Sequence, residues 1–143
     1  MSGPQAKPPA LIGWRLLALV YDFFPMFGAW FLVAAVFVAI RHDAVYGGMA
    51  GWLEFSILWL VTGAYAIASW RQGGQTLGMR PWRLWVIAAD GGRAALPALM
   101  LRYVVATVSL LLAGVGFWWA WIDRDHLTWH DRASHTRMRR QPA

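Results

Sequence analysis

The sequence lacks cysteine altogether and contains few charged residues, and both features exclude classes of protein. Without cysteine there is no disulfide bond, no structural thiolate metal site and no cysteine nucleophile. Charged residues make up only 14% of the 143 residues, whereas a soluble domain contains about 25%. Hydrophobic residues make up 59%, compared with about 45–50% in a soluble domain. The composition therefore predicts an integral membrane protein with one domain.

Motifs of common catalytic and nucleotide-binding sites are also missing. There is no Ser-His-Asp order typical of a hydrolase, and no Walker pattern. The glycines at Gly73, Gly74 and Gly78 are not followed by the Lys-Ser/Thr pair of a phosphate-binding loop. We therefore expect no enzymatic activity and no bound cofactor.

Acidic residues are outnumbered by basic ones, 7 against 13, which gives a formal net charge of +6. In a soluble protein this excess would suggest binding to nucleic acid. Here the arginines flank hydrophobic stretches, so membrane topology and anionic lipid explain them better. The expected partner is the lipid bilayer, and nucleic acid is not expected to bind.

Three apolar stretches cover residues 14–40, 50–70 and 94–122. A helix needs about 20 apolar residues to span a bilayer, and the first stretch is too long for a cleavable signal peptide. Between the second and third stretches, residues 71–93 mix tryptophan and leucine with arginine, as in an interfacial segment, and residues 86–89 have β-like character. The predicted fold class is an all-α membrane bundle of three hydrophobic elements plus an interfacial cytoplasmic segment.

The third apolar stretch is interrupted by Arg102 and by Gly114–Gly116. If it crossed the membrane fully, each side would hold six flanking basic residues, and the positive-inside rule could not choose an orientation. If it turned back at the glycines, eleven would lie inside and one, Arg41, outside. We therefore expect a hairpin or a strongly bent element, with both termini on the cytoplasmic side of the membrane.

An ionisable residue, Asp22, lies within the first apolar stretch. It follows Arg15 by seven positions, on the same helix face and about 10 Å deeper. Pro25 has no N–H, so it leaves the carbonyl of Tyr21 without its helical partner, next to the carboxylate. A charged residue inside a span costs about 2.5–3.5 kcal/mol and is by default a candidate functional site. The alternative is a structural role, in which Asp22 pairs with an arginine or a hydroxyl group.

An aspartate in the C-terminal region, Asp131, is a candidate partner for Arg15 near the N-terminus. Arg15 and Asp131 both flank apolar stretches at the expected cytoplasmic boundary, so we predict that they form an ion pair. Asp22 is the other candidate partner for Arg15. His126 and His130 could share a metal ion if both lay on one helix face. With no fixed third ligand, we predict no metal site and expect His130 to bond Asp131 or a helix end.

An ordered set of motifs along the chain resembles the RDD family of small bacterial membrane proteins, named for one Arg and two Asp. The set consists of Arg15, Asp22, GQTLG at Gly74–Gly78, ADG at Ala89–Gly91, Arg102, GVGFW at Gly114–Trp118 and HDRASHT at His130–Thr136. Two positions depart from the family's pattern: Met79 stands where lysine is usual, and His135 where glycine is usual. The resemblance implies a flexible tail over residues 1–12, one membrane domain over residues 13–137 and a basic tail over residues 138–143.

The resemblance also implies a function, the transport of ions or other small ligands. Arg15, Asp22 and Asp131 correspond to the residues that name the family, and Tyr21, Pro25, Arg102, His130 and Thr136 are expected to support them. We expect transport of a proton, a small cation or another small ligand, with Asp22 as the binding group. Transporter folds use internal repeats, and none is visible here, so the chain would act as a homo-oligomer or with a membrane partner. The alternative is a non-transporting accessory or assembly protein whose Arg–Asp pair is structural.

Overall fold

The computed structural model describes residues 9–44 and 47–141. Most of residues 1–12 and the end of the predicted basic tail therefore lie outside the described residues. The elements in chain order are α1 (Ile12–Arg41), α2 (Gly48–Gly73), β1 (Leu84–Ala88), α3 (Leu96–Leu111), α4 (Val115–Ile122), α5 (Trp129–Ala133) and β2 (Thr136–Arg140). The protein is mainly helical, as the apolar stretches predict.

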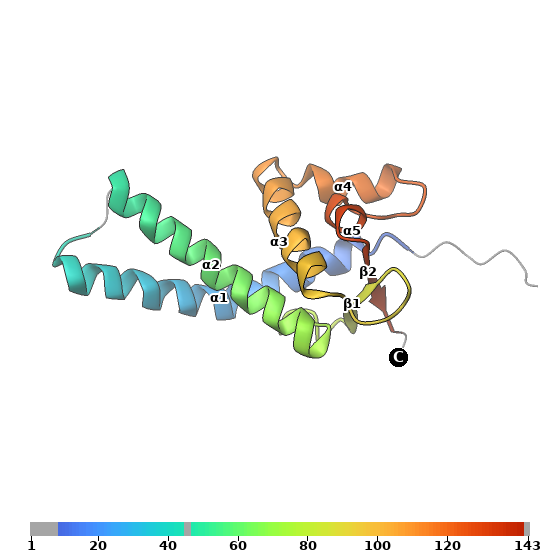
Figure 1. The fold of residues 1–143 in the computed structure, drawn as a ribbon, viewed down its shortest axis with the longest axis horizontal. Coiled ribbons are helices and arrows are strands. Elements are labelled where there is room, and N and C mark those ends of the chain that lie inside the picture. The colour runs from blue at the N-terminus through green and yellow to red at the C-terminus, as the bar shows by residue number, and fades with distance from the viewer. Residues whose placement is uncertain (1–8, 45–46, 142–143) are drawn as a thin grey trace, which may run out of the picture.

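The two long helices α1 and α2 form a hairpin whose arms diverge toward their connection (Figure 1). Both are long and apolar enough to cross a membrane. Each ends in a residue with left-handed backbone: His42 has φ 57° after α1, and Gly74 has φ 70° after α2. The N–H of each capping residue bonds a carbonyl of the last helical turn, Val38 or Trp70, which is a common way of ending a helix.

The third apolar stretch is bent, which confirms one part of the topology prediction. Helices α3 and α4 meet at an angle of 97° across a break of three residues. At the break, Gly114 has φ 75° and its N–H bonds the Ser109 carbonyl at 2.8 Å. A Cβ atom on Gly116 would lie only 2.9 Å from Cβ of Ser109, so a glycine is needed where α4 folds back over α3.

A small antiparallel sheet corrects the all-α prediction. Strand β1 pairs with β2 so that Val86 lies opposite Met138. Leu84 and Val86 alternate with more exposed neighbours, as expected of a strand with one face against the core. Residues 138–140 therefore belong to a strand, although the sequence places them in a basic tail, because their backbone groups pair with the segment between α2 and α3.

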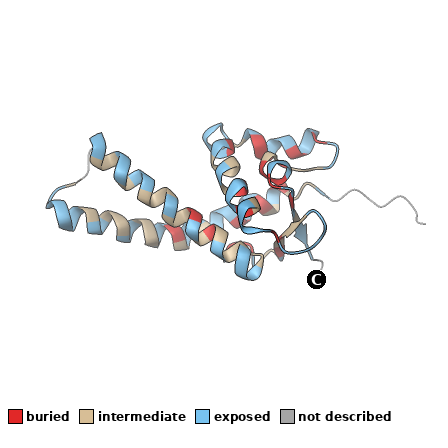
Figure 2. Ribbon diagram, viewed as in Figure 1, coloured by how far each residue is buried: buried red, intermediate tan, exposed pale blue. Residues whose placement is uncertain are grey.

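The buried core lies at the end of the hairpin opposite the α1–α2 connection (Figure 2). It is formed where the start of α1, the segment after α2, the sheet and the start of α3 meet, and its members are Ala18, Met79, Leu84, Val86, Ala94 and Leu99. Toward the connection, both long helices expose large hydrophobic side chains, including Phe24 at 70% and Phe31 at 70%. Such exposure on membrane-length helices is expected of a surface that faces lipid.

Candidate functional site

The short helix α5 holds Asp131 in place through its first turn. Thr128 is the N-cap: its hydroxyl accepts a hydrogen bond from the Asp131 N–H at 3.3 Å, and its N–H donates to Oδ2 of Asp131 at 3.3 Å. This reciprocal capping box satisfies two backbone donors at the helix start. It also fixes the direction of the Asp131 carboxylate, which is 1% exposed.

Asp131 binds two buried arginines from different helices. Arg15 in α1 lies 2.7 Å from Oδ2, and Arg102 in α3 lies 2.5 Å from Oδ1. The predicted contact between Arg15 and Asp131 is therefore present. Arg102 also donates to the Thr136 hydroxyl at 2.7 Å. The group of Arg15, Arg102 and Asp131, here called the arginine–aspartate triad, joins both ends of the chain and carries one excess positive charge.

The surroundings of the triad lower the pKa values of two residues in α5, Asp131 and His130. Burial alone would raise the pKa of Asp131, but the charges of Arg15 and Arg102 outweigh it and hold that pKa well below its usual range. Burial, followed by the charge of Arg102, lowers the pKa of His130 well below its usual value. His130 therefore stays neutral, with its Nε2 at 3.9 Å from Asp131 and its ring 4.8 Å from that of Phe117.

Asp22 does not pair with an arginine; it binds the segment that follows α2. Its Oδ1 accepts from the Tyr65 hydroxyl at 2.7 Å and from the Gly78 N–H at 2.8 Å. Its Oδ2 accepts from the Thr76 hydroxyl at 2.5 Å. The Tyr65 oxygen in turn accepts the N–H of Leu77 at 3.0 Å. Asp22 therefore holds the GQTLG segment against α1.

Gly78 is required for this close approach. A Cβ atom there would collide with the Ala18 carbonyl and lie 2.7 Å from Cγ of Asp22. Real Cβ atoms do not approach other heavy atoms so closely, so any other residue would displace the segment from α1. The glycine in this motif therefore has a packing reason that the sequence alone does not reveal.

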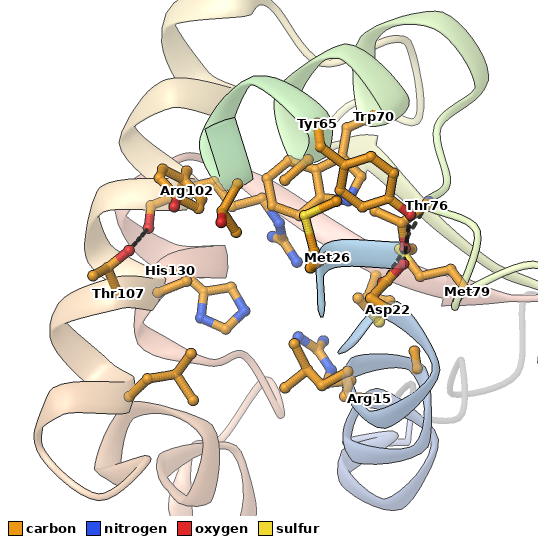
Figure 3. Close-up of a pocket in the computed structure, with 18 of the residues that line it drawn as sticks. Arg15, Asp22, Met26, Tyr65, Trp70, Thr76, Met79, Arg102, Thr107 and His130 are labelled. Atoms are coloured by element: carbon orange, nitrogen blue, oxygen red, sulfur yellow. Dashed lines mark hydrogen bonds between the residues drawn. The ribbon is translucent and has the colours of Figure 1, made fainter. Parts of the chain in front are cut away.

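A cavity of about 180 Å³ lies between Asp22 and the triad, among α1, α2 and α3. Its wall includes Arg15 and Arg102 on one side and Asp22 on the other, and the rest is mainly apolar. Figure 3 shows Arg15, Arg102 and His130 pointing toward a shared space. Its volume far exceeds the roughly 10–15 Å³ that one water molecule needs. The side chains of Arg15, Arg102, His130 and Asp22 thus border one chamber whose surface is mainly apolar.

The predicted supporting residues divide into two groups. Arg102 and His130 line the cavity, and Thr136 is buried next to Arg102 as an acceptor. Tyr21 and Pro25 are not among the residues that line it. Tyr21 instead packs its ring edge against Trp82, with ring centroids 5.5 Å apart, and is 47% exposed.

The two histidines that were considered as a metal pair, His126 and His130, do not share a helix face. His126 lies in the loop before α5, and its Nδ1 is 3.1 Å from the Ala120 carbonyl, while His130 is inside α5. Within residues 9–44 and 47–141, no group of three or more His, Asp or Glu side chains is placed to hold a metal ion. His135 has φ 49°, a left-handed conformation that suits the glycine usual at this position.

Several site residues were not found from the sequence. Tyr65, Thr76 and Gly78 were not connected to Asp22, and Arg102 was not connected to Asp131. One signal was available for Arg102, because an arginine within an apolar stretch needs a carboxylate partner. Arg132, the residue after Asp131, pairs with Asp123 at 2.5 Å.

Comparison with known proteins gives one result about the chain as a whole. The model of the family described as the RDD family matches residues 9–135. This range includes Arg15, Asp22, Arg102 and Asp131, and therefore the triad and every residue that lines the cavity except Met138. Comparisons with the curated proteins and with the solved structures gave no match.

Proposed function

The chain belongs to the RDD family of membrane proteins, and from this premise we propose that it transports a small ligand across the bacterial inner membrane. The candidate cargoes are a proton, a small cation or another small ligand. Asp22 is the titratable group on which this transport depends. The observation that carries the proposal is the cavity among α1, α2 and α3, whose wall includes charged residues of α1 and α3.

The free energy needed to place charged residues at membrane depth supports a functional role for those residues. Each charged residue at membrane depth costs about 2.5–3.5 kcal/mol on insertion scales. The triad accounts for Arg15, Arg102 and Asp131 as a structural unit, because each charge has a partner within hydrogen-bond distance. Asp22 has no such ion pair among the described residues; its partners are two hydroxyl groups and one N–H.

The contacts of Asp22 suggest how ligand movement is coupled to the protein. Any proton or ligand that reaches the carboxylate has to compete with Tyr65, Thr76 and Gly78 for its two oxygens. Occupancy of Asp22 would then weaken docking of the GQTLG segment, because three of the roughly four acceptor positions of the carboxylate are already used. In the proposed mechanism the segment opens when Asp22 is occupied, and the triad keeps the neighbouring end of the cavity closed.

We further propose that transport requires an oligomer or a membrane partner. The described residues contain two membrane-length helices and one bent pair, and we infer that one copy of these helices does not enclose a pathway across the bilayer. In this arrangement both termini lie on the cytoplasmic side, and the segment over residues 76–83 lies at the membrane interface next to the sheet.

The test is a flux measurement in proteoliposomes with a trapped pH-sensitive dye under imposed proton, sodium and potassium gradients. Flux in the native protein and its loss in Asp22→Asn are expected. The matched control is Asp90→Asn, because Asp90 is an exposed aspartate in a turn outside the cavity. Equal flux from Asp22→Asn and the native protein, both inserted and folded, would remove Asp22 from the mechanism.

A second candidate function is supported by the triad itself. Its three charges lock α1, α3 and α5 together, which is also what an accessory or assembly protein without transport activity would need. Native mass measurement in lipid nanodiscs separates the two functions. A strict monomer without flux would favour the accessory role.

A further inference from the structure

A groove at the sheet end of the molecule is lined by the three arginines of β2, Arg137, Arg139 and Arg140. This groove, here called the β2 groove, has a volume of about 280 Å³ and lies between β2, the loop before α5 and the residues that precede α1. All three arginines are exposed. The apolar part of the wall is formed by Pro9, Leu11, Ile87, Leu127 and Met138. The β2 groove therefore presents guanidinium groups next to an apolar surface.

The guanidinium groups of β2 have no carboxylate partner among the described residues. Arg137 and Arg139 make no ion pair and no side-chain hydrogen bond within that part of the chain. Arg140 is held in place by other groups: its Nε donates to the Trp82 carbonyl at 3.2 Å, and its guanidinium lies 4.0 Å from the centre of the Trp14 ring. One arginine is thus fixed in position, and two remain available to a ligand.

The wall of the β2 groove has an excess of positive charge. Its one carboxylate, that of Asp125, lies 3.5 Å from Arg132, which does not line the groove. Arg15 also borders the groove, but it is buried and paired with Asp131. A phosphodiester has one negative charge and two free oxygens, and the planar guanidinium group matches this geometry with two parallel hydrogen bonds. The charge and the donors therefore suit a phosphodiester.

The β2 groove lies at the depth of the lipid headgroups. Helix α1 has 30 residues and is about 45 Å long, so it exceeds the roughly 30 Å hydrocarbon core and its ends reach the headgroup layer. Figure 1 shows β2 at the same end of the molecule as the start of α1. There the rings of Trp14 and Trp82 lie 5.2 Å apart, and indoles favour the membrane–water boundary. Arg140, which contacts both residues, is thus placed at this boundary.

We propose that the β2 groove is a binding site for an anionic phospholipid. The phosphodiester lies at the arginines of β2, and the glycerol and the first acyl carbons lie against the apolar wall. Phosphatidylcholine carries a phosphodiester too, but its ammonium group cancels the charge, so it binds more weakly. The three arginines of β2 do not line the cavity that contains Asp22. The site is therefore separate from the proposed transport function.

The binding test titrates the full chain, in a nonionic detergent, with dioleoylphosphatidylglycerol and counts bound lipids by native mass spectrometry. One saturable phosphatidylglycerol per chain is expected, bound about tenfold or more tightly than dioleoylphosphatidylcholine. Equal affinity for the two lipids would show that the arginines play no part and would overturn the proposal. Inorganic phosphate at the concentration of the lipid is expected to leave the lipid bound. Its displacement of the lipid would identify a site for free anions and would also overturn the proposal.

A double variant, Arg137→Gln with Arg139→Gln, tests the position of the site. Each arginine near an anionic lipid strengthens association about fivefold, so this variant should bind phosphatidylglycerol roughly 25-fold more weakly. Its melting temperature should not change, because neither side chain has a partner among the described residues.

The matched control is Arg80→Gln with Arg93→Gln, which removes the same charge from two exposed positions outside the β2 groove. Phosphatidylglycerol binding should be nearly unchanged in this control. Equal losses in the two double variants would mean that net charge, and no particular site, attracts the lipid, and native affinity in Arg137→Gln with Arg139→Gln would place the lipid elsewhere. Either result would overturn the proposal. Asp22→Asn should leave phosphatidylglycerol binding intact, so the lipid site and the transport function fail independently.

Discussion

Removing the charge of Asp131 is the most informative perturbation of this fold. Asp131→Asn keeps the size of the side chain and an oxygen for the capping box with Thr128. It removes the only carboxylate that contacts Arg15 and Arg102 within the described residues, at 2.7 and 2.5 Å. Both guanidinium groups would then be buried without a counter-charge, because their side chains are only 3% and 2% exposed.

The expected loss of stability in each variant follows from these contacts. Removing one partner of a buried ion pair costs about 3–5 kcal/mol, and proteins of this size change melting temperature by roughly 2–4 °C per kcal/mol. Asp131→Asn should therefore lower the melting temperature by about 6–20 °C. Arg15→Gln should cost less, about 1.5–3 kcal/mol, because Asp131 keeps its contact with Arg102. The double variant should cost less than the sum of the two, by about 0.5–3 kcal/mol.

Thermal unfolding in one fixed detergent, followed by tryptophan fluorescence, measures all three variants. The exposed Asp90→Asn serves as the control for loss of one negative charge. Two results would refute the reasoning. One is a melting temperature for Asp131→Asn close to that of Asp90→Asn, and the other is strictly additive losses in the double variant, which would show that Arg15 and Asp131 do not interact.

Three further predictions concern protonation, packing and orientation. Burial and Arg102 lower the pKa of His130 in the folded chain, so below about pH 6.5 the unfolded chain binds a proton that the folded chain does not. Stability should fall between pH 7 and pH 5, and His130→Gln should flatten this dependence; an unchanged slope would contradict the assignment. Gly78→Ala should lower the melting temperature because of its collision with Ala18, whereas Gly73→Ala, with no atom within 4 Å, should not; equal effects would argue against the close approach. Reporter fusions at both termini should be cytoplasmic, and a periplasmic C-terminal reporter with a cytoplasmic N-terminus would instead require a third full span.

The membrane helices could be predicted because their signal is local. The apolar stretches at residues 14–40 and 50–70 became α1 and α2, and the glycines at Gly114–Gly116 marked the bend between α3 and α4. The contact between Arg15 and Asp131 was predictable because charges at a membrane boundary need partners. The helices and the bend depended on composition within a short segment, and the contact depended on the charges of two residues that flank apolar stretches.

The rest depended on how distant segments meet. Asp22 was recognised as unusual, but its partners lie 43 to 56 positions away, and the crossing of α1 and α2 determines them. Strand β2 resembles a charged tail because four of its five residues, TRMRR, are polar. Only its pairing with β1 makes it a strand. Arg102 was noted, but nothing in the sequence indicates that two arginines share one carboxylate.

Arg15 and Asp131 are far apart in the sequence, and this affects the order in which the triad is synthesised. Asp131 leaves the ribosome 116 residues after Arg15, which takes roughly 6–23 s at about 5–20 residues per second. During that interval α1 enters the membrane with an arginine whose partner has not yet been synthesised. A product that ends between residues 102 and 131 therefore contains both arginines of the triad without the carboxylate that pairs them in the complete fold.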